Sequence, residues 1–340
     1  MRLRSRKVLN RREDAAKDCG LLRSHFDPLT VGTGFGILSA LAYTGANIAL
    51  KQVTVPGDFD WAIWVSCIKA VPTALTAWAL VGYRALRGLP ALPPRQLVVP
   101  LLLMGLFMQF GGNAMFQWSL GLVGLALTVP VSFATLILST AVCGRLFLAE
   151  PITARTAAAM GTLILSIVFL SVGVRNATES VAAGSSWLMG GGAILAACTA
   201  GIAYGTSSVT IRWTLARGVS HSATLVLLAT SGVVGLGLLS LSRMGLESLK
   251  QTPISDLQIM LLAGVLNAIA FFSLSAALKH ITTIRANLLN TSQTALAAAA
   301  GVLWFAEPLT AGLIIGTALT VAGLLLMENR RAQRRMEDGR

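Results

Sequence analysis

The stretch FLAEPIT at residues 147–153 returns as WFAEPLT at residues 304–310. Each copy ends one long apolar stretch and precedes another, and the two glutamates, Glu150 and Glu307, lie 157 residues apart. That separation is nearly half of the 340-residue chain. We therefore predict two related halves that share the same kind of helix junction.

The composition is that of a membrane protein. Hydrophobic residues make up 54% of the chain and charged residues only 12%, and the mean hydropathy is +0.71. A soluble domain carries about 25% charged residues, so this deficit indicates a surface that faces lipid. The apolar stretches are continuous rather than alternating, which favours helices over a β-barrel. The predicted fold class is an all-α polytopic membrane protein.

Ten apolar stretches have roughly the 17–25 residues that a helix needs to cross a bilayer. They cover residues 31–51, 61–83, 97–118, 123–148, 154–174, 187–211, 222–242, 256–278, 286–305 and 309–328. Each half holds five, and an odd number inverts the second copy in the membrane. We predict two inverted five-helix repeats at 31–174 and 187–328, a linker at 175–186, and basic tails at 1–30 and 329–340.

A second pair of matched residues supports the repeat. Ala-Tyr at Tyr43 returns as Ala-Tyr at Tyr204, and a basic residue follows eight positions later in each case, at Lys51 and at Arg212. In the ten-span topology Lys51 lies outside and Arg212 inside. This is the arrangement that an inverted repeat requires.

The basic residues behind the net charge of +13 are divided unequally between the two predicted sides of the membrane. If the N-terminus is cytoplasmic, 22 of the 27 Lys and Arg residues fall inside and four outside. This asymmetry is typical of the positive-inside rule and predicts that both termini are cytoplasmic. We assign the basic charge to topology and to anionic lipids rather than to nucleic acid. The four cysteines have no disulfide or metal-binding spacing.

The two Glu-Pro pairs, Glu150-Pro151 and Glu307-Pro308, have two interpretations. Proline suits the first position of a helix, and a carboxylate is stabilised near a helix N-terminus. The pairs can therefore start the helices at 154–174 and 309–328 in tight hairpins. Alternatively, they act as gates or ion contacts at opposite mouths of the protein.

Lys69 lies near the middle of the stretch 61–83, where a cation is costly unless it meets water or a partner. Pro72, three residues later, predicts a kink in the same helix. One interpretation is a solvated central site in which Lys69 binds an anionic or carboxylate group. The other is a lysine that snorkels to the interface or is bonded internally.

Other polar side chains lie at mid-span depth and are expected to face the interior. The strongest candidates for substrate binding, after Lys69, are Tyr43, Asn47, Asn113, Tyr204 and Gln293. Amides can equally form bonds between helices. Gly201 and Gly205, four residues apart, predict close helix packing, and Pro130 predicts a break in the helix at 123–148.

Several classes of protein lack their motifs in this sequence. All 14 acidic residues lie in tails, loops or span ends, so no carboxylate proton relay is predicted. No HExxH or GxxxxGK[ST] motif occurs, and no Ser lies in a GxSG setting opposite an intramembrane His. We therefore expect no enzyme activity, no catalytic residue, no metal and no cofactor.

With its ten spans, the Ala-Tyr pairs and the repeated Ala-Glu-Pro phrase, the chain resembles the EamA-like branch of the drug/metabolite transporter superfamily over residues 30–328. The resemblance implies inverted repeats around a central cavity and export or exchange of small metabolites or drugs. It also implies a bacterial cytoplasmic membrane. The family's helix-junction phrase corresponds to Glu150-Pro151 and Glu307-Pro308. The charge of Lys69 and the long basic N-terminal tail depart from the family pattern.

The predicted function is secondary transport by alternating access. The open alternatives are an exchanger of sugar phosphates or other anionic metabolites, and a membrane sensor or scaffold that transports nothing. Expected partners are a small-molecule substrate, membrane lipids and, as an alternative left open, a second copy of the chain in a homodimer.

Overall fold

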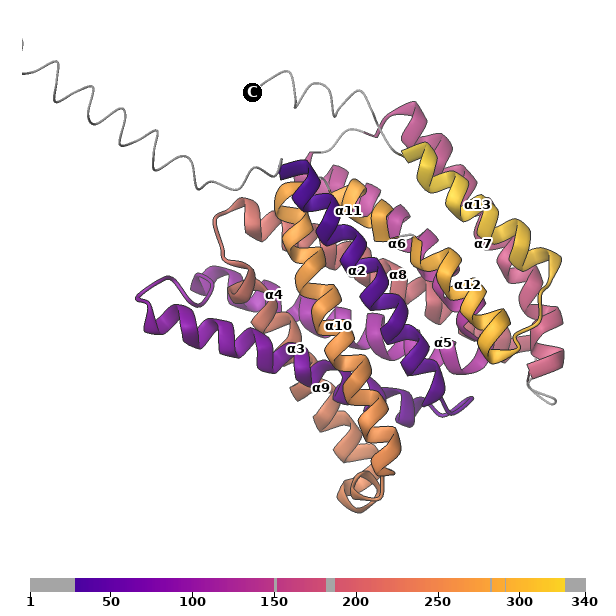
Figure 1. Cartoon of the computed structure of the whole chain (residues 1–340), viewed down its shortest axis with the longest axis horizontal. Helices are drawn as coiled ribbons and strands as arrows, with labels where there is room; N and C mark the ends of the chain where they lie inside the picture. The colour runs from indigo at the N-terminus through magenta and orange to yellow at the C-terminus, as the bar shows by residue number, and fades with distance from the viewer. Residues whose placement is uncertain (1–27, 150–151, 182–186, 282, 291, 328–340) are drawn as a thin grey trace, which may run out of the picture.

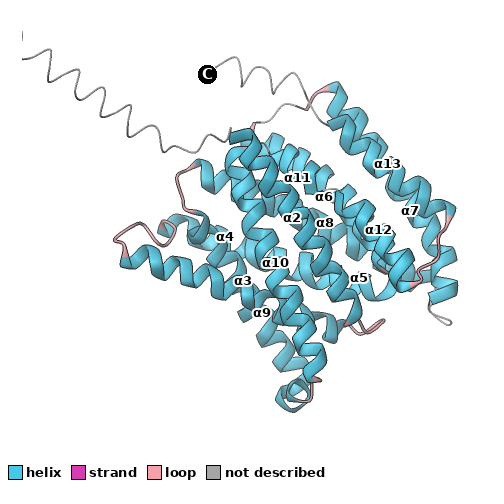
Figure 2. Cartoon of the chain, viewed as in Figure 1, coloured by secondary structure: helices cyan, strands magenta, loops and turns pink. Residues whose placement is uncertain are grey.

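A computed structural model of the chain describes residues 28–149, 152–181, 187–281, 283–290 and 292–327. These residues form helices and connecting loops, with no strand among them (Figure 2). The helices are α2 (Pro28–Gln52), α3 (Phe59–Leu86), α4 (Arg95–Phe107), the π-helix η1 (Met108–Ala114), α5 (Met115–Val123), α6 (Leu125–Leu148), α7 (Ala154–Val181), α8 (Trp187–Ala216), α9 (His221–Lys250), α10 (Ile254–His280), α11 (Thr283–Asn290), α12 (Ser292–Phe305) and α13 (Ala311–Met327). The expected basic tails lie outside the described residues, apart from 28–30.

Each predicted span coincides with helix in the described part of the chain. α4, η1 and α5 together make the third span, and α11 and α12 fall on the ninth. Among the described residues, seven helical segments are long and apolar enough to cross a membrane: α2, α3, α4–α5, α6, α8, α9 and α10. α7 and α13 carry shorter apolar segments. The fold is therefore that of a multi-pass membrane protein, while the number ten remains a prediction.

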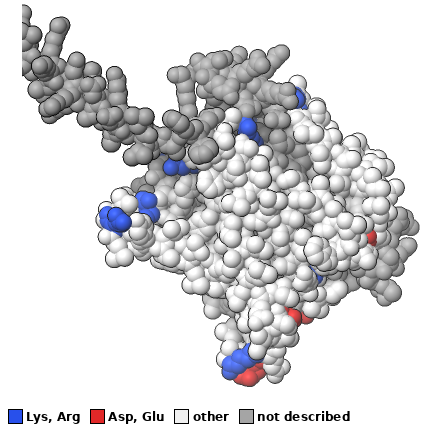
Figure 3. All heavy atoms as spheres, in the orientation of Figure 1, with Lys and Arg blue, Asp and Glu red and all other residues white. Residues whose placement is uncertain are grey.

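The outer surface is rich in large apolar side chains. Leu75, Leu103, Leu195 and Leu303 are more than 60% exposed, which in water would be unfavourable. Figure 3 shows one face on which the charged side chains lie towards the edges and a broad central area is uncharged. This is the surface that a lipid bilayer would cover.

Helices from the two halves pack against one another in pairs (Figure 1). α2 packs on α10, α3 on α9, α6 on α8, and α7 on α13. Each of these pairs joins one helix from before residue 182 with one from after it. The interior is therefore built jointly by both halves of the chain.

Small residues allow the closest of these approaches. Gly201 of α8 lies so close to α6 that a methyl group there would overlap the carbonyl oxygen of Ser132. The Ser132 hydroxyl donates to the carbonyl of Ala197 across the same contact, at 3.0 Å. Gly205, one turn later, meets α6 in the same way. The predicted packing role of these two glycines is thus observed.

Replacing Gly201 with alanine is expected to destabilise the protein by about 2–3 kcal/mol, because α6 and α8 would have to separate. Gly191→Ala in the same helix is the matched control, since nothing lies within 4 Å of the position of its added methyl group. That control should be neutral or slightly stabilising, because alanine favours helix. Thermal unfolding of the two purified variants would measure the difference, and equal midpoints would contradict it.

Two features differ from the sequence predictions. α6 runs without interruption through Pro130, so the predicted break is wrong. Pro130 lies in the second turn of α6, where the hydrogen bond it removes is close to the helix end. In addition, α7 continues to Val181, into the range expected for the linker. Residues 182–186 lie outside the described part.

Candidate functional site

A cavity of about 100 Å³ lies between the two halves. Its lining includes all six residues that the sequence proposed for substrate binding: Tyr43, Asn47, Lys69, Asn113, Tyr204 and Gln293. They come from α2, α3, η1, α8 and α12. The structure therefore brings together residues that are up to 250 positions apart in the sequence (Tyr43 to Gln293). A cavity of this size holds several water molecules.

One wall of the cavity is a chain of directed hydrogen bonds. The Lys69 ammonium donates to the Asn113 Oδ1 atom at 2.7 Å, and the Tyr204 hydroxyl donates to the same oxygen at 3.0 Å. The Asn113 amide then donates to Gln109 Oε1 at 2.6 Å, and Gln109 donates to the carbonyl of Leu228 in α9 at 3.1 Å. Asn113 therefore holds residues from both halves in place.

The π-helix η1 positions this wall, and sequence reasoning missed it. The wider turn of a π-helix is rare and is often found at functional sites. Gly112 lies inside it, and a methyl group there would come within 2.8 Å of the Tyr204 ring. The glycine thus lets Tyr204 lie directly against η1. The pair Gly111-Gly112 beside Asn113 was the available signal in the sequence.

A second group of lining residues carries weaker and incomplete hydrogen bonding. The Asn47 amide lies 3.5 Å from Gln293 Oε1, at the limit of a hydrogen bond. Within the described ranges, Gln293 Nε2 and Asn290 Oδ1 have no partner, although these residues are only 2% and 3% exposed. Both line the cavity. Buried amides normally find partners, so these two atoms are available to water or a ligand.

Lys69 is 3% exposed and forms no ion pair among the described residues. An ammonium has three donors, and Asn113 accepts only one of them. Snorkelling is thereby excluded for the described conformation, because the side chain ends in the interior. The residues that the structure describes contain no group of three His, Cys, Asp or Glu side chains that could hold a metal ion.

Apolar side chains complete the lining. Phe116, Phe133 and Phe271 border the cavity together with aliphatic residues. The Phe116 and Tyr204 rings are in contact, with centroids 6.3 Å apart. The site therefore combines one cation and several amides with an apolar rim, as small-molecule sites do.

A second polar site lies at the junction between α12 and α13. Glu307 accepts hydrogen bonds from the backbone N–H groups of Leu125 and Ala126, both at 2.7 Å. It also pairs with Lys51 at 3.7 Å, and Lys51 donates to the carbonyl of Leu120 at 3.2 Å. The carboxylate thus caps the N-terminus of α6, and the lysine caps the C-terminal end of α5. The helix dipoles favour a negative group at the first position and a positive group at the second.

This finding changes the interpretation of the Glu-Pro phrase. Glu307 was expected to start its own helix, but α13 begins at Ala311 and its first turn is capped by Thr310, which accepts from Leu313 N–H at 3.1 Å. Glu307 caps a helix of the other half instead. Gly124 makes this approach feasible, since its φ is +83° and a methyl group would lie 2.5 Å from the Glu307 carboxylate.

The two repeated phrases share an unusual backbone conformation. Ala149 and Ala306, which precede the glutamates, have φ of 54° and 52°, in the left-handed region that alanine rarely adopts. Glu150 and Pro151 lie outside the described residues, and Pro308 follows Glu307 in the loop before α13. Equal strain at equivalent positions indicates that both junctions turn in the same way.

Arg212 occupies the position in the second half that Lys51 has in the first. It donates to the carbonyl of Ile281 at 3.4 Å and to the Thr283 hydroxyl at 3.3 Å, between α10 and α11. The start of α2 also meets this junction, because Gly32 lies against Ile281. From Gly32 to Lys51, α2 rises roughly 28 Å, close to the thickness of the hydrocarbon core. The two junctions therefore lie at opposite ends of α2.

Comparisons with known proteins agree with this architecture. The model of the EamA-like transporter family matches residues 191–328. A crystal structure described only as "Crystal structure of protein" has a TM-score of 0.58 at 18% identity. The similarity covers 90% of this chain and 98% of the other, and at this identity it shows the fold alone. No curated protein matches the chain. The family match supports the resemblance seen in the sequence over residues 191–328, so the second half of this integral membrane protein is similar to the EamA-like transporter family.

Proposed function

We propose that the protein is a secondary transporter that exports or exchanges a small metabolite by alternating access around the central cavity. The observation that carries this proposal is that both halves of the chain line one buried polar cavity. Binding sites of transporters built from repeats lie at such an interface near the bilayer midplane. We propose Lys69, Tyr43, Asn47, Asn113, Tyr204 and Gln293 as substrate-binding residues, with no catalytic role.

We further propose that the halves are inverted five-helix repeats related by a twofold axis. The pairing of α3 with α9 and of α7 with α13 joins equivalent positions of the two repeats, and α2 with α10 has its counterpart in α8 with α5. The positions of Lys51 and Arg212 at opposite ends of α2 support the same relation. With both termini cytoplasmic in a bacterial inner membrane, the two Glu-Pro junctions would then lie at opposite mouths and act as gates.

Alternating access predicts that one cavity position reacts with a polar reagent from both sides of the membrane. Ser208→Cys, in a variant whose native cysteines are replaced, is expected to react with a membrane-impermeant methanethiosulfonate in right-side-out and in inside-out vesicles. Ser208 lines the cavity. The control is Ser166→Cys, which is buried between α7 and α13 and bonded to the carbonyl of Gly316 at 2.8 Å.

The control position should stay unlabelled from either side. A sensor or scaffold has no reason to open its interior to both faces. Labelling of Ser208→Cys from one side only, or from neither, would therefore reject the transport mechanism. This test needs no knowledge of the substrate.

A further inference from the structure

The unused hydrogen-bonding groups of the cavity are mostly donors. The acceptor oxygen of Asn113 already receives bonds from Lys69 and Tyr204, and Gln109 Oε1 receives one from Asn113. What remains is the rest of the Lys69 ammonium, the unpartnered Nε2 of Gln293 and one unpartnered acceptor, Asn290 Oδ1. The Tyr43 hydroxyl also makes no hydrogen bond to any described residue. A ligand that fits these groups must be rich in acceptors.

The charge of the residues that line the cavity also favours a ligand that brings acceptors, and specifically an anion. Lys69 is the one charged residue among the lining residues described, and no carboxylate lies among them. A bound ammonium would face Lys69 with no counter-charge. A bound monoanion would supply the missing partner, whereas a phosphate dianion would call for a second cation.

The size and the apolar rim limit the rest of the molecule. The volume of about 100 Å³ is well below the roughly 300–1,000 Å³ of sites for drug-sized ligands. Phe116, Phe133 and Phe271 line the same cavity as the donor groups and give it an apolar part. A short branched or aryl group fits that space better than a polyol.

We infer that the substrate class of this cavity is a small apolar organic carboxylate that lacks an ammonium group, such as a branched-chain carboxylic or 2-oxo acid. This inference rests on the proposed transport function and specifies its cargo. The carboxylate takes the free donors of Lys69, with Gln293 and Tyr43 as further donors, and the apolar group lies among the phenylalanines.

A matched series of ligands tests the inference in the purified full-length protein. The series comprises 4-methylpentanoate, leucine, 3-methylbutylamine, 4-methylpentanol and 3-methylbutyl phosphate, which share one branched body and differ in the polar group. At saturating concentration, 4-methylpentanoate is expected to raise the midpoint of thermal unfolding by about 3 °C or more, because a ligand that binds only the folded state stabilises it. The other four compounds should shift it by less than half as much.

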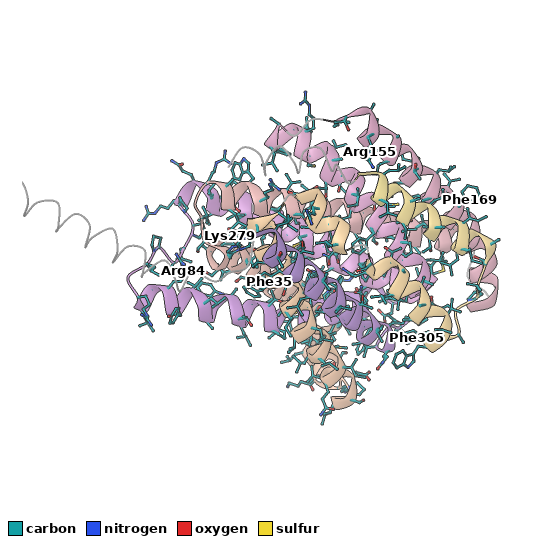
Figure 4. All side chains as sticks on the ribbon, turned by 45° about the horizontal axis from the view of Figure 1, so that its top comes forward. Phe35, Arg84, Arg155, Phe169, Lys279 and Phe305 are labelled. Carbon is teal, nitrogen blue, oxygen red and sulfur yellow. The ribbon has the colours of Figure 1, made fainter. Side chains whose placement is uncertain are left out.

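Variants identify the groups responsible. Lys69→Gln should abolish the shift caused by 4-methylpentanoate, Lys69→Arg should retain part of it, and Gln293→Leu should reduce it. Lys279→Gln is the matched control, since Lys279 is exposed in the last turn of α10 (labelled in Figure 4) and does not line the cavity. The control should keep the full shift.

Two results would overturn the inference: an equal or larger shift with leucine, the amine, the alcohol or the phosphate, or an undiminished carboxylate shift in Lys69→Gln. These outcomes are separate from the failure of the transport mechanism. If Ser208→Cys is labelled from both sides while the carboxylate gives no selective shift, only the substrate class is wrong. If labelling is one-sided, transport fails whatever the ligand series shows.

Discussion

Lys69→Met is expected to make the protein more stable, by about 1–2 kcal/mol, while it abolishes ligand binding and transport. A cation in the middle of a membrane helix costs about 2.5–3.5 kcal/mol on insertion scales, and methionine removes that cost at similar volume. The substitution leaves no acceptor unpaired, because Asn113 Oδ1 keeps the hydrogen bond from Tyr204 at 3.0 Å. Stability and function should therefore change in opposite directions.

Lys51→Met provides the comparison for this result. Lys51 is also a largely buried lysine near one end of α2, but it pairs with Glu307 and bonds the carbonyl of Leu120. Its removal leaves a buried carboxylate without its cation, which typically costs about 3–5 kcal/mol. The same substitution should thus stabilise the protein at position 69 and destabilise it at position 51.

The measurement is chemical unfolding of both variants in mixed micelles beside the parent protein, together with uptake of labelled 4-methylpentanoate into proteoliposomes. A Lys69→Met variant that is less stable than the parent would mean that Lys69 has a structural role in the free protein. Full uptake by the same variant would remove Lys69 from the substrate site. Either result contradicts the expectation.

Much of the candidate site could be predicted from the sequence, because its rules are local. The length of an apolar stretch determines whether it can cross the bilayer. The helix positions therefore followed from the lengths and positions of the apolar stretches. An amide at mid-span depth is unfavourable in lipid and is expected to face the interior. Asn47 and Asn113 were therefore expected to point inwards, whereas snorkelling remained an alternative for Lys69. The structure places all three around one cavity.

The remaining features depend on contacts between distant segments. The π-helix η1 has no clear sequence signature beyond Gly111-Gly112, and its Gly112 packs against Tyr204 of a distant helix. The role of Glu307 was assigned to its own helix because capping rules consider neighbours in sequence. Its partners, Leu125 and Ala126, lie about 180 residues earlier. No local pattern could identify them.

Glu307→Gln is expected to destabilise the protein by about 2–4 kcal/mol, although it changes one carboxylate into an amide of the same shape. The carboxylate accepts from two adjacent backbone N–H groups at 2.7 Å, and glutamine has one acceptor oxygen for them. One buried donor is left unpaired, and the charge-assisted bonds and the pair with Lys51 are lost. Each of these losses lowers the free energy of unfolding.

Glu247→Gln is the matched control for Glu307→Gln. Glu247 pairs with Lys250 one turn away at 3.0 Å, but both side chains are more than half exposed. Exposed ion pairs contribute about 0–1 kcal/mol to stability. This variant should therefore have nearly the same free energy of unfolding as the parent protein. A double-mutant cycle of Glu307→Gln with Lys51→Met should give a coupling energy of about 1–3 kcal/mol, because the two side chains form one network.

The same substitution also tests the proposed gate. Glu307 joins the loop between α12 and α13 to the α5–α6 junction, so its bonds tie the two halves together at one end of α2. If this end is a gate, Glu307→Gln should populate the conformation open on that side. Labelling of Ser208→Cys should then become several-fold faster from that face and no faster from the other. Faster labelling from both faces to the same extent would mean that Glu307 holds the fold together without gating it.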